Sequence, residues 1–358
     1  MPVRRALHGP ESGEVHMKIT QVEAQIFPDP LVPQLFVHIT TDEGLEGVGE
    51  AWWGLPLGPV ESAIREVLAP QVLGQDPRQI QFLWEKMYRH AYRYGTEGVI
   101  LCGLSGLDLA LWDLLGKRHG VPVAHLMGGL VRDSIRVYAS LPPLRDEGRL
   151  RAEIQRAVEA GFKGVKLHEV EVRMAAVARK VLPDGFALMF DVNGHFSPVE
   201  AEDVARRLRD FQVTWFEEPV WPMQDHEAMR RVRERSGMPL AAGENEYQLR
   251  AFHRLMISGA VDYVMAEIAK IGGLTMARKI SALAELLNFP ICPHCYRIGP
   301  ALYADIQWAL SHTPMDWLEI PWLPEGYQFP AAVPMPAIEN GEIRLPHGPG
   351  LGMPFQKE

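Results

Sequence analysis

Short apolar runs alternate with longer amphipathic stretches over most of the chain beyond Gly129. Each run has the length of a buried strand, and each connection is long enough for a helix. This alternation is typical of βαβ units with a parallel sheet, and eight such units form a (β/α) barrel. The eight runs read SIRVYAS, FKGVKLH, FALMFD, TWFEEP, PLAAGE, DYVMAE, FPICPH and DWLEI.

The region before Gly129 has a mixed pattern. A strand-like stretch begins at Lys18 and includes two predicted strands, 35–40 and 46–51. Helical periodicity follows and stops before Gly120 and Pro122, so this block is expected to be α+β. The predicted helices cover 60–69, 79–89 and 99–119.

Composition and charge narrow the classes of partner. The chain has 358 residues, of which 47% are hydrophobic and 23% charged, as in an ordinary globular protein of about two domains. A net charge of −9 gives no support to a nucleic-acid or anionic-membrane partner. No run of 18 apolar residues suggests a membrane span, and the first 16 residues lack the apolar core of a secretory signal. We expect a cytoplasmic enzyme, a homo-oligomer, with a small-molecule partner.

The three cysteines are Cys102, Cys292 and Cys295. An odd, sparse count argues against a disulfide framework and suits a reducing compartment. Cys292 and Cys295 form a C-x-x-C, which could be a redox pair or half of a zinc site, but no second Cys/His pair completes four ligands. Free thiols at a strand end are the favoured interpretation.

Polar residues end the predicted strands at regular intervals of 25, 26, 27, 23, 27 and 25 residues. One βα unit of a barrel takes about 30 residues. Because the strand ends of a barrel meet at one rim, where barrel enzymes place catalysis, these side chains should converge there. They are Lys166, Asp191, Glu217, Glu244, Glu267, His294 and Glu319.

Three consecutive strand ends supply Asp191, Glu217 and Glu244. Convergent carboxylates repel one another without a cation, and an oxygen-only set suits Mg²⁺ ahead of Mn²⁺ or Ca²⁺. We predict one Mg²⁺ with coordination positions left open for a substrate carboxylate. The bound ion would stabilise the enediolate that forms when the α-proton leaves. Glu218 follows Glu217, but strand alternation lets only one point inward, and the spacing favours Glu217.

Candidate bases flank these acids. Lys166 and His168 share a strand face, and Glu267 and His294 come from neighbouring strands on the far side. A histidine backed by a carboxylate is the arrangement of a general base, so His294 is favoured. Glu319 could donate a proton or a hydrogen bond to the developing enolate if it stays protonated.

Ten segments between about Met17 and Gly352 carry a family resemblance. They read TTDEGLEGVGEAW, GLDLALWDLLGKRHGVPVAHLMGG, GFKGVKLH, FDVNG, WFEEP, AAGEN, AKIGGLT, PHCYRIG, WLE and GPGLG. In these segments the chain resembles the enolase superfamily, specifically its mandelate racemase subgroup. The resemblance implies a (β/α)7β modified TIM barrel over residues 131–320 and an α+β capping domain over residues 17–130. It also implies a C-terminal segment, 321–358, that returns to the capping domain. Residues 1–16, which precede a second methionine, Met17, and a strand-like run, are expected to be a disordered leader or an over-extended start.

The resemblance also implies site roles. Asp191, Glu217 and Glu244 would hold Mg²⁺, Lys166 would neutralise the substrate carboxylate, Glu319 would assist as an acid and His294 would be the base on one face of the substrate. Two positions depart from the family pattern. The second lysine of the usual Lys-x-Lys on strand two is His168, and the aspartate usually paired with the histidine is Glu267. His168 is either a replacement base or a polar substrate contact.

Substrate contacts are expected from the capping domain. The loop 27–35 and the segment containing Trp52, Trp53 and Gly54 would cover the barrel mouth, by the family pattern. The segment MYRHAYRYG contains Arg89 and Arg93 and suits either a hydroxylated acid or a domain interface. Asn193 is a candidate substrate donor or a turn residue.

Four reactions are considered on this scaffold. Dehydration of a sugar acid to a 2-keto-3-deoxy acid needs one base that later serves as the acid, which the His294–Glu267 pair can supply. Racemisation or epimerisation needs a base on each face, and the missing second lysine weakens it. Cycloisomerases and dipeptide epimerases of the superfamily usually have a lysine where Glu267 stands, so both are disfavoured. We predict an acid-sugar dehydratase acting on a polyhydroxy acid, with a racemase or an inactive ligand-binding barrel as alternatives.

Overall fold

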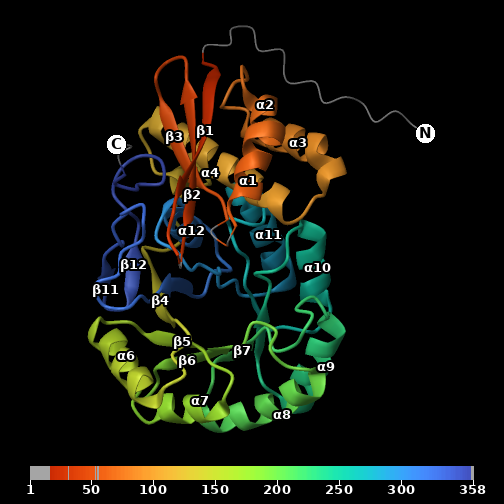
Figure 1. Cartoon of the computed structure of the whole chain (residues 1–358), viewed down its shortest axis with the longest axis vertical. Helices are drawn as coiled ribbons and strands as arrows, with labels where there is room; N and C mark the ends of the chain where they lie inside the picture. The colour runs from red at the N-terminus through yellow and green to blue at the C-terminus, as the bar shows by residue number, and fades with distance from the viewer. Residues whose placement is uncertain (1–16, 31, 53, 55, 356–358) are drawn as a thin grey trace, which may run out of the picture.

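The computed structural model describes residues 17–30, 32–52, 54 and 56–355. The predicted leader 1–16 and Trp53 of the predicted substrate loop lie outside these ranges. An antiparallel sheet and several helices from the first third of the chain stand above a barrel of parallel strands with helices around it (Figure 1). The predicted fold class is confirmed.

The N-terminal sheet consists of β1 (Ile19–Phe27), β2 (Gln34–Thr41) and β3 (Glu46–Glu50), paired antiparallel in that order. Both predicted strands are found, each end within one residue of its expected position. Strand β3 lies directly on helix α4 (Val99–His119). A Cβ atom added at Gly49 would be 2.1 Å from the main-chain oxygen of Gly106, so this contact requires glycine in β3.

Helix α4 has the predicted bounds and is buried on nearly every side. It is the one described helix long and apolar enough to cross a membrane, but 89% of its apolar window is buried inside the protein, as in a core helix.

The predicted helix 60–69 is part of a continuous run of three short helices, and the predicted helix 79–89 is α3. The helical elements around α4 are α1 (Gly58–Ser62), the π-helix η1 (Ala63–Leu68), α2 (Ala69–Val72), α3 (Ile80–Ala91), the 3-10 turn η2 (Tyr92–Tyr94) and α5 (Val123–Leu126).

The barrel contains all eight predicted strand segments in order. Seven are β4 (Ser134–Leu141), β5 (Gly164–His168), β6 (Ala187–Asp191), β7 (Trp215–Glu217), β8 (Leu240–Ala242), β9 (Tyr263–Val264) and β10 (Leu318–Pro321). The remaining segment contains Ile291, which bridges Val264 of β9 on one side and Met315 on the other. Strand β10 pairs in parallel with β4, which closes the barrel.

Seven helices connect the barrel segments. They are α6 (Glu147–Glu159), α7 (Val172–Arg179), α8 (Pro198–Leu208) with the 3-10 turn η3 (Arg209–Phe211), α9 (His226–Ser236), α10 (Leu249–Ile257), α11 (Gly273–Leu287) and α12 (Pro300–Ser311). The capping helices contact the start of α11: Trp84 Nε1 donates to the Gly272 carbonyl at 2.8 Å, and the Thr275 amide donates to Asp108 Oδ2 at 2.9 Å.

The C-terminal segment contacts both parts of the molecule. The hairpin of β11 (Ile338–Glu339) and β12 (Glu342–Arg344) pairs antiparallel with β4 of the barrel. Beyond it, the Leu351 amide donates to Asp113 Oδ1 on α4 at 2.8 Å, and the rings of Phe355 and Phe36 meet edge to face at 5.3 Å. The proposed boundaries at 17–130, 131–320 and 321–358 stay a prediction.

Candidate active site

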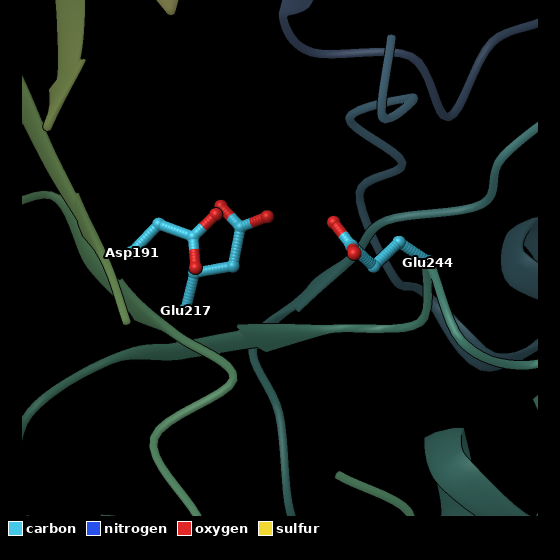
Figure 2. A group of neighbouring side chains, drawn as sticks. All are labelled: Asp191, Glu217 and Glu244. Carbon is cyan, nitrogen blue, oxygen red and sulfur yellow. The ribbon is translucent and has the colours of Figure 1, made fainter. Parts of the chain in front are cut away.

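Three carboxylates converge at one end of the barrel. Asp191 ends β6 and Glu217 ends β7, and the two are partners in the parallel ladder, so their side chains share a face. Glu244 follows β8 by two residues and points toward them from the other side (Figure 2). Each of the three offers an oxygen within 4.8 Å of the others.

This carboxylate cluster has the chemistry of a divalent-cation site. Asp191 and Glu217 are buried, and burial raises the pKa of the Glu217 carboxyl despite the opposing charge of Lys166. Glu244 Oε2 is also buried, and His294 Nε2 lies 3.1 Å from it. Three convergent carboxylates that offer only oxygen donors fit a hard ion such as Mg²⁺. The described residues therefore fit the predicted metal.

Lys166 lies among the acids at the end of β5. Its Nζ atom is 3.0 Å from Glu217 Oε1, 3.0 Å from Glu319 Oε1 and 3.4 Å from Asp191 Oδ2. Burial alone would lower the pKa of Lys166, but the surrounding carboxylates raise it well above its ordinary value. Lys166 is therefore a fixed positive charge in the site.

His168 lies on the same strand and shares Asp191 with Lys166, but its second partner is a main-chain carbonyl. Its Nδ1 is 2.6 Å from the Leu141 carbonyl, and since a carbonyl can only accept, Nδ1 carries a proton. Its Nε2 is 3.3 Å from Asp191 Oδ2. Burial opposes protonation, but the hydrogen bond to Asp191 raises the pKa of His168 overall. Both ring nitrogens are thus engaged, one by the main chain and one by a predicted metal ligand.

His294 and Glu267 form the predicted pair on the far side of the cluster. His294 Nδ1 is 2.7 Å from Glu267 Oε2, and His294 Nε2 is 3.1 Å from Glu244 Oε2. Burial opposes protonation, but the charges of Glu244 and Glu319 and the bond to Glu267 raise the pKa of His294 to about 9. The Glu267 carboxylate stays ionised, because Arg297 and His294 outweigh burial and lower its pKa.

Glu319, at the second residue of β10, completes the rim. The Tyr138 hydroxyl donates to its Oε2 at 3.1 Å, and the Cys295 amide donates to the same oxygen at 3.2 Å. Burial would raise the pKa of Glu319, but the charge of Lys166 lowers it, which favours the carboxylate. Its role as a proton donor stays a prediction.

Glu217 and Glu218 have different contacts, as strand alternation predicts. Glu217 faces the cluster, whereas Glu218 turns away with φ at +41° and accepts two hydrogen bonds from Asn245 Nδ2. Asn193 is exposed, and its main-chain N–H donates to Asp191 Oδ1 at 2.9 Å. Asn193 therefore supports a predicted metal ligand, and its contact with substrate stays a prediction.

The predicted substrate residues separate into two groups. The Trp52 ring lies 4.7 Å from the Lys270 ammonium, which also donates to Asn245 Oδ1 beside Glu244. Arg89 instead pairs with Glu85 on its own helix at 3.2 Å, and Arg93 is exposed in η2. The structure therefore brings Trp52 near the rim, while both arginines lie on the helical surface of α3 and η2.

All three cysteines are buried and free. Burial raises the pKa of Cys292 and Cys295, which makes them poor thiolates, and Cys295 Sγ lies 3.6 Å from the Arg297 carbonyl. The structure agrees with the interpretation of free thiols rather than a redox pair.

Several supporting residues were missed by the sequence argument. Trp215 Nε1 donates to Glu217 Oε2 at 3.0 Å, and Tyr138 supports Glu319 in a similar way. Trp215 could have been found, because it stands two residues before Glu217 on the same strand face. Arg297 and Lys270 gave no such signal, since their partners are distant in sequence.

Comparisons with known proteins agree with this geometry. The mandelate racemase / muconate lactonizing enzyme N-terminal domain matches residues 12–128, and the enolase C-terminal domain-like family matches residues 149–358. D-galactarolactone cycloisomerase of Agrobacterium fabrum is 32% identical, with 90% of this chain and 89% of the relative covered. Arabinonate dehydratase of Saccharolobus solfataricus is 30% identical, with 88% and 86% covered.

A racemase from Streptomyces coelicolor, solved with bound magnesium, has a TM-score of 0.83 and 27% identity, with 93% of this chain and 96% of that chain covered. Members of the superfamily use Mg²⁺. The expected chemistry of the superfamily, dehydration or isomerisation, fits the names of these relatives. The predicted family is confirmed, and the chain belongs to the mandelate racemase subgroup of the enolase superfamily.

Proposed function

We propose that this chain uses one Mg²⁺ to dehydrate a sugar acid to a 2-keto-3-deoxy acid. The main support is the difference between the two histidines of the site. Each has its Nε2 beside a predicted metal ligand, Asp191 for His168 and Glu244 for His294. At Nδ1, however, His294 is paired with the Glu267 carboxylate, whereas His168 bonds the Leu141 carbonyl. One competent base suits an elimination, while racemisation needs a base on each face of the α-carbon.

Asp191, Glu217 and Glu244 would hold the metal. When bound, Mg²⁺ supplies positive charge that stabilises the enediolate. Lys166, fixed by its three ion pairs, would bind the substrate carboxylate beside the metal ligands. Sugar acids carry hydroxyl groups that need hydrogen-bond partners, and the rim offers Lys270, whose ammonium has donors beyond the one that Asn245 accepts.

His294 would carry out both proton transfers. Its Nε2 takes the α-proton while Nδ1 keeps its hydrogen bond to Glu267. The same Nε2 then returns a proton to the β-hydroxyl as the C–O bond breaks, so water leaves and the enol product tautomerises to the keto acid. Both events occur on one face of the substrate, which makes this a syn elimination.

Cycloisomerisation of a sugar-acid lactone is a second candidate, favoured by the Agrobacterium relative. The absence of a lysine at Glu267 argued against it in the sequence, but that relative is among the similar proteins at 32% identity. The reaction conserves the formula of the substrate, whereas dehydration removes one water. Mass spectrometry therefore separates the two.

The test is a screen of mono- and diacid sugars and their lactones with Mg²⁺, read by semicarbazone absorbance and mass. We expect a 2-keto-3-deoxy product that is lost on EDTA treatment and restored by Mg²⁺. Tight Mg²⁺ binding without product from any member would overturn the proposal and favour a ligand-binding barrel. An epimer without keto product would favour a racemase.

A further inference from the structure

A buried arginine lies behind the His294–Glu267 pair. Arg297 is fully buried, and its Nη1 donates to Glu267 Oε2 at 3.2 Å while Nη2 donates to Oε1 of the same carboxylate. A guanidinium that binds both oxygens fixes the plane of a carboxylate, which the point charge of a lysine does not do. The orientation of Glu267 therefore depends on Arg297.

The remaining contacts of Glu267 leave its carboxylate a single orientation. Oε1 also accepts from the Ala269 amide at 2.9 Å, and Oε2 accepts from His294 Nδ1 at 2.7 Å. Glutamate has one more rotatable bond than the aspartate usual at this position, so more freedom must be lost to aim it at the histidine. The two-point contact between the Arg297 guanidinium and both Glu267 oxygens restricts this rotation.

Arg297 is in turn held by the N-terminal sheet. Glu50, the last residue of β3, places Oε2 at 3.6 Å from Arg297 Nε and accepts from the Ala301 amide at 3.0 Å. Its Oε1 accepts from Gln34 Nε2 at 3.1 Å, and Gln34 also donates to the Ile298 carbonyl at 2.9 Å. Two neighbouring strands therefore hold the loop that contains Arg297.

These contacts form a buried row from the capping sheet to the barrel rim. Glu50, Arg297, Glu267 and His294 are in contact in that order. Each of the first three is fully buried, so moving one would take a charged partner away from its neighbour in the interior. Glu50 is the last residue of β3, and Trp52 follows it by two residues in sequence and lies near the rim. Strand β3 therefore connects this buried row to a residue near the rim.

We propose that Arg297 is the positioning residue of the His294–Glu267 pair, and that Glu50 makes this positioning depend on the seating of the N-terminal sheet. The inference rests on the proposed function, because it takes His294 as the base. The ion pairs of Arg297 in the described structure are with Glu267 and Glu50, so it acts on substrate only through Glu267.

The first test is kinetic. Arg297→Lys keeps the positive charge and removes the two-point contact, so kcat should fall on the order of 10–100-fold with little change in KM or in Mg²⁺ affinity. Arg179→Lys is the matched control. Arg179 donates to three main-chain carbonyls at the end of α7, away from the site, and this change should leave kcat within about twofold.

The second test needs no substrate and so separates this inference from the proposed function. In Mg²⁺-loaded protein labelled with ¹⁵N-histidine, the Nδ1–H signal of His294 is assigned from its loss in His294→Asn. Arg297→Lys should shift or broaden this signal, because the Glu267 carboxylate can rotate, while Arg179→Lys should not. If no sugar acid is turned over by the wild type, this reading alone decides the inference.

The link to the capping sheet is tested with Glu50→Gln, which removes the charge and keeps the shape. We expect a smaller change of the same His294 signal and a several-fold fall in kcat. An unchanged signal in folded Arg297→Lys would overturn the positioning role, whatever the effect on kcat. An unchanged signal and kcat in Glu50→Gln would overturn the link to the sheet. If Arg297→Lys does not fold, Arg297→Gln, which also lacks the two-point guanidinium contact with Glu267, replaces it in both tests.

Discussion

His168 and His294 lie at opposite ends of the carboxylate cluster, and their neighbours differ in kind. His168 bonds a main-chain carbonyl through Nδ1 and faces Asp191 through Nε2. His294 bonds a carboxylate through Nδ1, and that carboxylate is itself fixed by an arginine. A carbonyl sets a tautomer only, whereas an ionised carboxylate also stabilises the imidazolium that forms when a base takes a proton.

Residue type alone does not identify the base. Both histidines are near acids, and both have a raised pKa. What separates them is the group bound at Nδ1, since the Glu267 carboxylate carries a charge that stabilises protonated His294, while the Leu141 carbonyl carries none. The first and the last of the four predictions below test this difference, and the other two test the metal ligands and the contact between the capping helices and the barrel.

The largest effect is expected for His294→Asn. Asparagine keeps a polar side chain but cannot accept the proton, and a positioned base typically contributes about 10²–10⁴-fold, so kcat should fall by that amount. Steady-state kinetics on the substrate found in the screen measure it. Nearly full turnover would move the role of base to His168 or Lys166.

A second effect tests the metal ligands without touching either histidine. Trp215→Phe removes the N–H that supports Glu217 Oε2 and keeps an aromatic ring in the barrel interior. Groups that hold a ligand typically contribute about 10–100-fold to metal affinity, so Mg²⁺ should bind that much more weakly by calorimetry. Trp317→Phe, in the same interior cluster, is the control. Equal affinities for the two variants would contradict a role for Trp215.

A third prediction concerns stability where the capping helices meet the barrel. Burial raises the pKa of Asp108 to about 7, so the folded protein binds a proton that the unfolded chain has lost. The stabilisation is complete below the unfolded pKa near 3.8 and is lost as pH rises through about 7. Between pH 5 and pH 7 this group should cost about 2 kcal/mol of unfolding free energy. The free energy of unfolding from urea denaturation should fall over this pH range, and it should fall less steeply in Asp108→Asn.

The smallest effect is expected for His168→Asn. If His168 only contacts substrate or supports Asp191, kcat should fall by less than about tenfold, compared with the larger loss at His294.

A labelling experiment with the unmodified protein in D₂O tests the same point. Deuterium should enter the substrate or product only on the face that His294 serves. Deuterium in both α-epimers at comparable rates, without keto product, would make His168 a second base and support the racemase alternative.

Much of the fold and of the site could be predicted because the signals are local. Helix α4 was bounded by its periodicity and by Gly120, and the choice of Glu217 over Glu218 followed from strand alternation. Arg297 could not be predicted in its role, because its partners Glu267 and Glu50 come from other elements and no spacing rule joins them. The two arginines at 89 and 93 were chosen from local density alone, which does not tell which face of a helix meets the rim.

The C-terminal segment has an evolutionary consequence. Its hairpin pairs with the first residues of β4, from Ser134 to Arg136, and its last described residues pack on Asp113 and Phe36 of the first third of the chain. Recombination between relatives that exchanged only the 5′ part of the gene would pair a new capping sheet with a foreign tail. A chimaera that takes only its capping domain from a relative should therefore unfold at a lower temperature than one that also takes the C-terminal segment of that relative.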